Sequence, residues 1–140
     1  MPRKTKKTSI DSQSNPPPRP KVLVIDDDSF ITGIYTLTLT NEGFDVVLAK
    51  NGLEGIALAK KIMPHIILLD LVMPGIDGFE TLERIKREEK LKPIPVVILS
   101  GLSQPEDIDR ALHLGAVSYL RKTQTLPGDC LAKIREILRI

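Results

Sequence analysis

The chain has 140 residues, which is enough for one domain with a hydrophobic core and too few for two domains of ordinary size. Hydrophobic residues make up 41% of it and charged residues 27%, as in globular proteins, and no apolar run approaches the ~20 residues that cross a bilayer. The net charge of +2 hides an asymmetry, because residues 1–20 sum to +4 and the remainder to −2. We therefore expect one globular domain that does not enter a membrane.

The first 20 residues are predicted to be a basic, proline-rich, disordered leader or linker. They end in "NPPPRP", a composition that favours extended backbone, so the folded domain is expected to span residues 21–140. The leader contains no aromatic residue, and we interpret it as a solvated arm rather than a nucleic-acid binder. No signal-peptide stretch follows its basic residues, and the single cysteine, Cys130, excludes an internal disulfide. These features favour a cytoplasmic protein.

Five short apolar runs alternate with segments of helical period in the rest of the chain. The runs are 22–25 (VLVI), 44–48 (FDVVL), 66–69 (IILL), 96–99 (VVIL) and 117–120 (VSYL). Apolar spacing predicts a helix after each of them, although the first helical segment, 29–43, is rich in β-branched residues that disfavour helix. Strands made of unbroken aliphatic residues indicate a parallel sheet covered on both faces. The sequence therefore predicts an α/β domain of five β/α units.

Polar side chains follow four of the five runs, at the positions where such a sheet binds its ligands. Open parallel sheets bind ligands beyond the carboxyl ends of their strands. The residues expected to converge there are Asp26, Asp27, Asp70, Ser100 and Lys122. Their formal charge is −2, and two like charges ~4 Å apart repel by ~4 kcal/mol at an effective dielectric of about 20. A hard divalent cation such as Mg²⁺, which prefers oxygen ligands, would offset that repulsion.

These residue types together suit phosphoryl transfer. A metal held by carboxylates keeps coordination positions for phosphoryl oxygens, while a lysine and a hydroxyl stabilise charge on the remaining oxygens. A further carboxylate can attack phosphorus and form an aspartyl phosphate. The sequence has neither a GxxxxGK[ST] loop nor a GxGxxG motif, so the phosphate is expected to arrive on a carrier other than a bound nucleotide.

Four segments resemble the signature segments of receiver domains, the phosphoacceptor modules of two-component response regulators. They are "VLVIDDDS", "HIILLDLVMPGIDGFE", "PVVILSG" and "GAVSYLRK". The resemblance covers residues 21–140 and implies a flavodoxin-like, doubly wound sheet of five parallel strands in the order 2-1-3-4-5 with five flanking helices. It also implies a signalling domain rather than an enzyme, with self-phosphorylation and slow self-dephosphorylation as its only chemistry.

The resemblance assigns a role to each residue near the strand ends. Asp70 matches the phosphoacceptor of receiver domains. Asp26 and Asp27 match the acidic pair that binds Mg²⁺, Asp27 directly and Asp26 largely through water, and Val72 matches the residue whose backbone carbonyl completes the metal site. Lys122 matches the lysine that pairs with the acid and then with the phosphate. The site is therefore expected to carry out phosphorylation of one of its own carboxylates.

Two further residues match the switch of receiver domains. The hydroxyl of Ser100 would turn toward the phosphoryl group, Gly101 would leave room for that motion, and the ring of Tyr119 would rotate with it. The expected partner surface is the fourth helix, fifth strand and fifth helix, within about residues 104–140. The implied partners are a sensor histidine kinase or phosphotransfer protein, a downstream protein or fused output domain, and a second copy in a phosphorylation-dependent homodimer. No recognition helix is present, so direct nucleic-acid binding is not expected.

The sequence departs from the receiver pattern beside the site. Thr123 follows Lys122 where the family has a proline in a cis peptide bond, and a cis bond before another residue costs ~2.5–4 kcal/mol, so we predict a trans bond here. Val72 and Leu102 occupy the positions that border the path of a hydrolytic water. Neither side chain can orient water by hydrogen bonding, which predicts slow loss of the phosphoryl group.

Two other functions remain as alternatives from the same residues. "VLVIDDDS" also fits the opening of haloacid-dehalogenase-type phosphatases, with Asp26 as nucleophile and Asp28 as general acid, but Asp70 would then have no role. The second alternative is a receiver-like interaction module that takes no phosphate, for which Thr123 is the only support. Outside the phosphatase alternative, Asp28 or Ser29 suits the N-cap of the first helix, with Asp28 favoured, and Asp77 is predicted to be the N-cap of the third.

Overall fold

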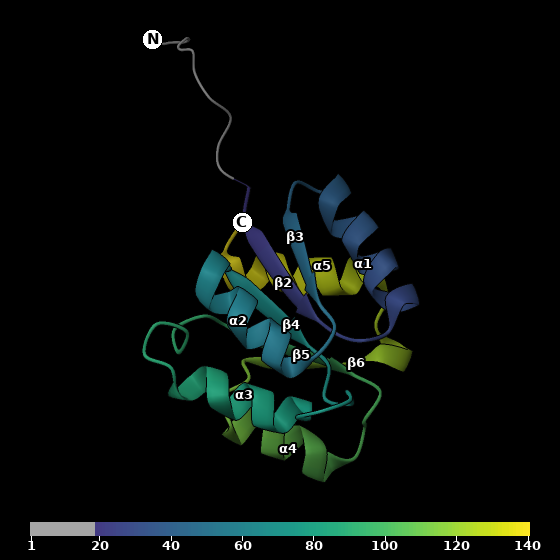
Figure 1. The fold of residues 1–140 in the computed structure, drawn as a ribbon. Coiled ribbons are helices and arrows are strands. Elements are labelled where there is room, and N and C mark those ends of the chain that lie inside the picture. The colour runs from purple at the N-terminus through teal and green to yellow at the C-terminus, as the bar shows by residue number, and fades with distance from the viewer. Residues whose placement is uncertain (1–18) are drawn as a thin grey trace, which may run out of the picture.

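The computed structural model describes residues 19–140, which form one sheet with helices on both faces (Figure 1). Residues 1–18 of the predicted leader lie outside the described residues. The elements, with the labels of Figure 1, are β2 Lys21–Ile25, α1 Ser29–Asn41, β3 Asp45–Ala49, α2 Gly52–Ile62, β4 Ile66–Leu69, α3 Gly78–Arg87, β5 Val96–Ser100, α4 Pro105–His113, β6 Ser118–Arg121, the 3₁₀ turn η1 Lys122–Gln124 and α5 Pro127–Leu138. Each of the five apolar runs forms a strand, within a residue or so of its predicted bounds.

The sheet has the predicted topology. Its strands lie in the order β3-β2-β4-β5-β6, and all four pairings are parallel. Counted along the chain from the first strand to the fifth, this is the order 2-1-3-4-5, so the predicted order is confirmed. Strand order reverses at β2, which pairs with β3 on one side and β4 on the other. The carboxyl ends of β2 and β4 therefore lie side by side at the switch point, where such sheets bind ligands.

Alternate side chains of the inner strands fill two separate cores. Leu23 and Ile25 of β2 belong to the core under α2, α3 and α4, whereas Val22 and Val24 belong to the core under α1 and α5. Figure 1 shows the two groups of helices on opposite faces of the sheet. Each buried aliphatic side chain contributes roughly 1.5–3 kcal/mol, so burial on both faces fixes the register of the strands that carry the acidic residues.

Helix α1 forms despite its β-branched composition, because its ends are capped and one side is buried. The side chain of Asp28 accepts hydrogen bonds from the backbone N–H groups of Phe30 at 3.0 Å and Ile31 at 3.2 Å, which confirms the predicted N-cap. Tyr35 and Leu39 are buried against the sheet and α5. Tertiary packing of this kind outweighs the small differences in helix propensity.

Two other predictions about backbone and capping can be compared with the structure. Asp77 accepts a hydrogen bond from Glu80 N at 2.9 Å at the start of α3, which confirms the second predicted N-cap. All peptide bonds of residues 19–140 are trans, the predicted Lys122–Thr123 bond included.

Gly55 lies inside α2, where an added Cβ would overlap the side chain of Ile25. A glycine here lets α2 approach β2 closely.

Among the described residues, no helix is both long enough and apolar enough to cross a membrane.

Candidate functional site

Three carboxylates meet at the carboxyl ends of β2 and β4. Asp26 and Asp27 follow β2, Asp70 follows β4, and the last residues of the two strands, Ile25 and Leu69, are paired in the sheet. Each aspartate offers one oxygen within 4.8 Å of an oxygen of the other two. Asp26 and Asp70 are each only 5% exposed, whereas Asp27 faces the solvent. The convergence predicted from the strand ends is confirmed for all three residues.

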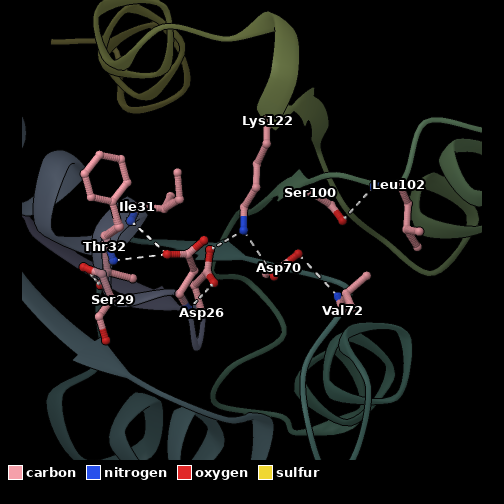
Figure 2. Close-up of polar contacts among 11 residues, drawn as sticks. Asp26, Ser29, Ile31, Thr32, Asp70, Val72, Ser100, Leu102 and Lys122 are labelled. Atoms are coloured by element: carbon pink, nitrogen blue, oxygen red, sulfur yellow. Dashed lines mark hydrogen bonds and ion pairs between the residues drawn. The ribbon is translucent and has the colours of Figure 1, made fainter.

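Lys122 joins the two buried carboxylates. Its Nζ lies 2.8 Å from Oδ2 of Asp26 and 3.2 Å from Oδ2 of Asp70 (Figure 2). The lysine is the first residue of η1, directly after the edge strand β6, so its side chain reaches past β5 to the switch point between β4 and β2. One ammonium between two buried carboxylates offsets their repulsion, and three carboxylates with one ammonium leave a net charge of −2.

Backbone N–H groups hold the remaining oxygens of the two buried acids. Oδ1 of Asp26 accepts a hydrogen bond from Asp28 N at 2.9 Å, and Oδ1 of Asp70 accepts one from Val72 N at 3.3 Å. Both oxygens of each buried carboxylate therefore have a donor, which offsets part of the cost of burying the charge. The two carboxylates are held in fixed orientations as a result.

Burial and charge shift the proton affinities within the cluster. Burial raises the pKa of Asp26, and the negative charge of Asp70 adds to this, while the donors Lys122 and Asp28 N–H oppose it. For Lys122, burial alone would lower the pKa, but the hydrogen bond to Asp26 and the charges of Asp70 and Asp26 outweigh it and raise the pKa. Lys122 is therefore an ammonium ion at neutral pH.

The donor set fits a hard divalent cation. All three side chains supply carboxylate oxygens, their separation allows one ion to contact each of them, and the net negative charge favours a cation. Asp27 is exposed, so the cluster is open to solvent on that side. The structure shows the Val72 N–H bound to Asp70, and a metal contact by the Val72 carbonyl stays a prediction.

The two predicted switch residues are linked through the backbone of Leu102. Ser100 is the buried last residue of β5, and its Oγ accepts a hydrogen bond from Leu102 N at 3.3 Å (Figure 2). The hydroxyl of Tyr119 donates to Leu102 O at 2.7 Å. Within the part of the chain that the structure describes, no other atom lies within 4 Å of the position that a Cβ of Gly101 would take. The backbone of Leu102, in the loop after β5, therefore connects Ser100 to Tyr119 of β6. From the sequence, Leu102 was expected only to border the path of a hydrolytic water.

Gly78, which follows the N-cap Asp77, packs against the backbone of Asp70. It is the first residue of α3, and an added Cβ would overlap the carbonyl oxygen of Asp70 and Cα of Leu71. Its N–H also donates to Leu71 O at 3.0 Å. The start of α3 thus packs directly on the backbone of Asp70. The signal in the sequence was a glycine inside a predicted helix start, but its reason lies in a tertiary contact.

Gly78→Ala is expected to lower the free energy of unfolding by about 1–3 kcal/mol or more, because backbone atoms cannot move aside as a flexible side chain can. Gly33→Ala is the matched control, since no atom of residues 19–140 lies within 4 Å of its Cβ position in α1, and alanine there should raise stability by about 0.5–1 kcal/mol. Urea denaturation followed by circular dichroism measures both. Equal stability of Gly78→Ala and the wild type would contradict the close contact.

Asp28 does not belong to the carboxylate cluster. Its side chain caps α1, and the three clustered acids among the described residues are Asp26, Asp27 and Asp70. The phosphatase alternative needs Asp28 as a general acid and leaves Asp70 unused. The observed arrangement instead commits Asp28 to the helix and places Asp70 beside the lysine.

Comparisons with known proteins agree with this geometry. A family model described as "Response regulator receiver domain" matches residues 22–134. RpaA of Synechocystis, a DNA-binding dual master transcriptional regulator, is 38% identical over 86% of this chain and 49% of its own length. The chemotaxis protein CheY4 of Vibrio cholerae has a TM-score of 0.80 at 28% identity, covering 86% of this chain and 99% of that one.

A further solved structure holds a metal. The Mn²⁺-bound form of the response regulator Rcp1 has a TM-score of 0.74 at 25% identity, covering 85% of this chain and 94% of that one. The chain spans about half the length of the curated relatives it matches.

Proposed function

The chain belongs to the response regulator receiver domain family, and from this we propose that Asp70 accepts a phosphoryl group from a sensor histidine kinase or a phosphotransfer protein. The observation that carries the proposal is the position of Asp70: it is buried, its Oδ2 contacts Lys122, and Asp26 and Asp27 offer oxygens within 4.8 Å. A buried carboxylate beside a cation and two further carboxylates supports the proposal that Asp70 is phosphorylated.

In the proposed reaction, a lone pair on an oxygen of Asp70 forms a bond to phosphorus. The bond from phosphorus to the donor nitrogen breaks, and its electron pair stays on that nitrogen. Lys122, which now bridges Asp26 and Asp70, is close enough to donate to a phosphoryl oxygen as negative charge shifts onto it. Asp26, Asp27, Asp70 and the carbonyl of Val72 would hold Mg²⁺. When bound, Mg²⁺ offsets the charge of these carboxylates and binds phosphoryl oxygens.

The response to phosphorylation is proposed to pass from Ser100 to the surface formed by α4, β6 and α5. The Ser100 hydroxyl would leave Leu102 N and turn to the phosphoryl group, and Tyr119 would change its contact with Leu102 O. Tyr119 belongs to β6, so its movement alters that surface directly. A downstream protein, a fused output domain or a second copy of the chain would bind there.

This proposal describes a signalling domain whose only chemistry is its own phosphorylation and slow dephosphorylation. The proposal also includes a cytoplasmic location.

The one cysteine, Cys130, is free and buried, and burial raises the pKa of its thiol to about 12. Such a thiol is unreactive, which suits a protein without disulfide chemistry.

Incubation with acetyl phosphate and Mg²⁺, followed by intact mass measurement, tests the proposal. We expect the wild type to gain one phosphoryl group and Asp70→Asn to gain none, because an amide lacks the nucleophilic oxygen. Asp28→Asn is the matched control, since asparagine also caps helices and the residue lies outside the cluster. Phosphorylation of Asp70→Asn at the wild-type level, or none in the wild type, would overturn the proposal.

Val72→Asn is expected to shorten the lifetime of the phosphoryl group about fivefold, the effect of one hydrogen bond of about 1 kcal/mol that orients a water. Val72 is 57% exposed beside Asp70 and offers no such bond in the wild type. Val117→Asn is the control. Val117 is similarly exposed, but it lies at the amino end of β6, the end of the strand away from the carboxylate cluster. Loss of the phosphoryl group is followed by mass, and equal half-lives in all three proteins would show that Val72 does not limit hydrolysis.

A further inference from the structure

β3 forms one edge of the sheet, with β2 as its neighbour on one side (Figure 1). On that side Asp45 N donates to Pro20 O, at the start of the parallel pairing. The N–H and C=O groups of successive residues in a strand point to alternate sides, so those of Val46 and Leu48 point away from β2. Within the part of the chain that the structure describes, no hydrogen bond reaches these four groups. We refer to them as the open edge of β3.

The open edge is short because side chains close both of its ends. Arg19 donates to Phe44 O at 3.1 Å, and Glu54 accepts from Lys50 N at 2.7 Å. These are the backbone groups that come next on the same side of the strand, before and after the open edge. The open edge therefore offers two donors and two acceptors, and buried groups of this kind need partners.

The side chains along the open edge are apolar. Val46, Val47 and Leu48 follow one another there, and Leu48 is 40% exposed. Edge strands are usually protected from pairing by a charge, a proline or a bulge, and none of these interrupts the three residues. Leu37 of α1 is 64% exposed, and with Leu48 it lines a groove of about 530 Å³ between α1 and β3. An added strand would cover both leucines.

We propose that β3 pairs with β3 of a second copy of this chain, in antiparallel orientation around a two-fold axis at Val47. Val46 N–H then donates to Leu48 O of the second copy, Val46 O accepts from Leu48 N–H of that copy, and symmetry repeats both bonds. The open edges of both copies are satisfied with no group left over. The two Val47 side chains meet at the axis, and each Leu48 lies beside Val46 of the other copy.

A second copy fits this edge better than an unrelated extended segment. Its open edge has the same length and the same order of donors and acceptors, whereas a longer strand would displace Arg19 and Glu54 from the backbone groups that they hold. Antiparallel pairing also places Arg19 and Asp45 of one copy at the same end as Glu54 of the other. Lys50 of the other copy lies there as well, so each end carries two charges of each sign. Arg19 contacts Asp45 at 3.1 Å and has further N–H donors for the incoming glutamate.

The first test uses the unphosphorylated full chain, because β3 lies at the edge of the sheet opposite β6 and apart from the carboxylate cluster. Sedimentation velocity over a wide concentration range is expected to show a monomer–dimer equilibrium. Hydrogen exchange at the amides of Val46 and Leu48 should slow as the concentration rises, since both N–H groups are bonded in the dimer. A chain that stays monomeric would overturn the inference, including one whose two amides are already protected by residues 1–18. A dimer in which exchange at these amides does not change with concentration would overturn it too.

Leu48→Lys is expected to weaken dimerisation about tenfold or more, because it replaces a buried apolar contact by a charge on the edge strand. Val117→Lys is the matched control, since Val117 is 52% exposed beside β6 at the opposite edge, and it should leave dimerisation unchanged. Circular dichroism checks that both variants fold. Wild-type dimerisation of Leu48→Lys, or equal weakening by the two variants, would contradict pairing through β3.

Two charge reversals test the antiparallel arrangement itself. Arg19→Glu and Glu54→Arg each bring like charges together at both ends of a homodimer, and each should weaken dimerisation about tenfold, the effect of two exposed pairs. A mixture of the two variants restores opposite charges at both ends, so a heterodimer close to wild-type affinity is expected. Native mass spectrometry distinguishes it from the homodimers, because the substitutions change the mass in opposite directions. A mixture without preference for the heterodimer would overturn the inference.

Discussion

Asp27→Ala is expected to weaken Mg²⁺ binding by at least about 100-fold, because even an outer contact of a metal site is worth about 10–100-fold in affinity and Asp27 would be a direct ligand. Asp27 is the exposed member of the cluster, so its loss creates no cavity and leaves no buried charge without a partner. Its effect should therefore fall on the metal and not on folding. Isothermal titration calorimetry with MgCl₂, together with thermal unfolding with and without Mg²⁺, measures both quantities.

The next residue along the chain supplies the control for this experiment. Asp28→Ala removes the N-cap of α1, which accepts from Phe30 N and Ile31 N, and should lower the free energy of unfolding by about 1 kcal/mol. Its Mg²⁺ affinity should stay near that of the wild type, since Asp28 contributes to the cluster through its backbone N–H and not its carboxylate. Equal loss of Mg²⁺ binding in both variants would contradict the assignment of separate roles.

Lys122→Met is expected to slow phosphorylation by acetyl phosphate by about 10²–10³-fold, the usual effect of removing one group that stabilises developing charge. Methionine keeps most of the aliphatic stem, and the side chain of Lys122 is only 17% exposed, so packing changes little. What is lost is the ammonium group between Asp26 and Asp70. The initial rate of phosphoryl incorporation, measured by mass at saturating Mg²⁺, is the readout.

Lys133→Met is the matched control for Lys122. Lys133 lies on α5, and its one ion pair within residues 19–140 is with Glu136, at 3.2 Å. Its loss should leave the rate unchanged. If Lys122→Met and Lys133→Met react at the same rate, the ion pairs of Lys122 serve stability alone and the proposed role is wrong.

The strand ends were the part of the site that could be predicted from sequence. Asp26, Asp70 and Ser100 each end a run of aliphatic residues, and parallel strands bring such ends to one edge of a sheet. Lys122 could be placed at the same edge by the same argument, and the resemblance implied its pairing with the phosphoacceptor, whereas its contact with Asp26 is shown by the structure. The topology was implied by resemblance to receiver domains and is confirmed by the pairing of the strands.

The contacts that could not be predicted from sequence are made by backbone atoms or depend on how distant segments pack together. Leu102 joins Ser100 to Tyr119 through its N–H and carbonyl, which no side-chain pattern reveals. A Cβ at Gly78 would overlap the backbone of Asp70, and a Cβ at Gly55 would overlap the side chain of Ile25. The need for each glycine therefore depends on where another segment of the chain packs.

The identity of the phosphorylated residue is the measurement that tests the central claim most directly. Sodium borohydride reduces an aspartyl phosphate to homoserine, and peptide mass spectrometry after digestion locates the converted residue. With chain treated with acetyl phosphate and Mg²⁺, we predict homoserine at position 70 and unchanged aspartate at 26, 27 and 28. Homoserine at position 26 would point instead to a phosphatase-type nucleophile and contradict the assignment of Asp70 as the phosphoacceptor.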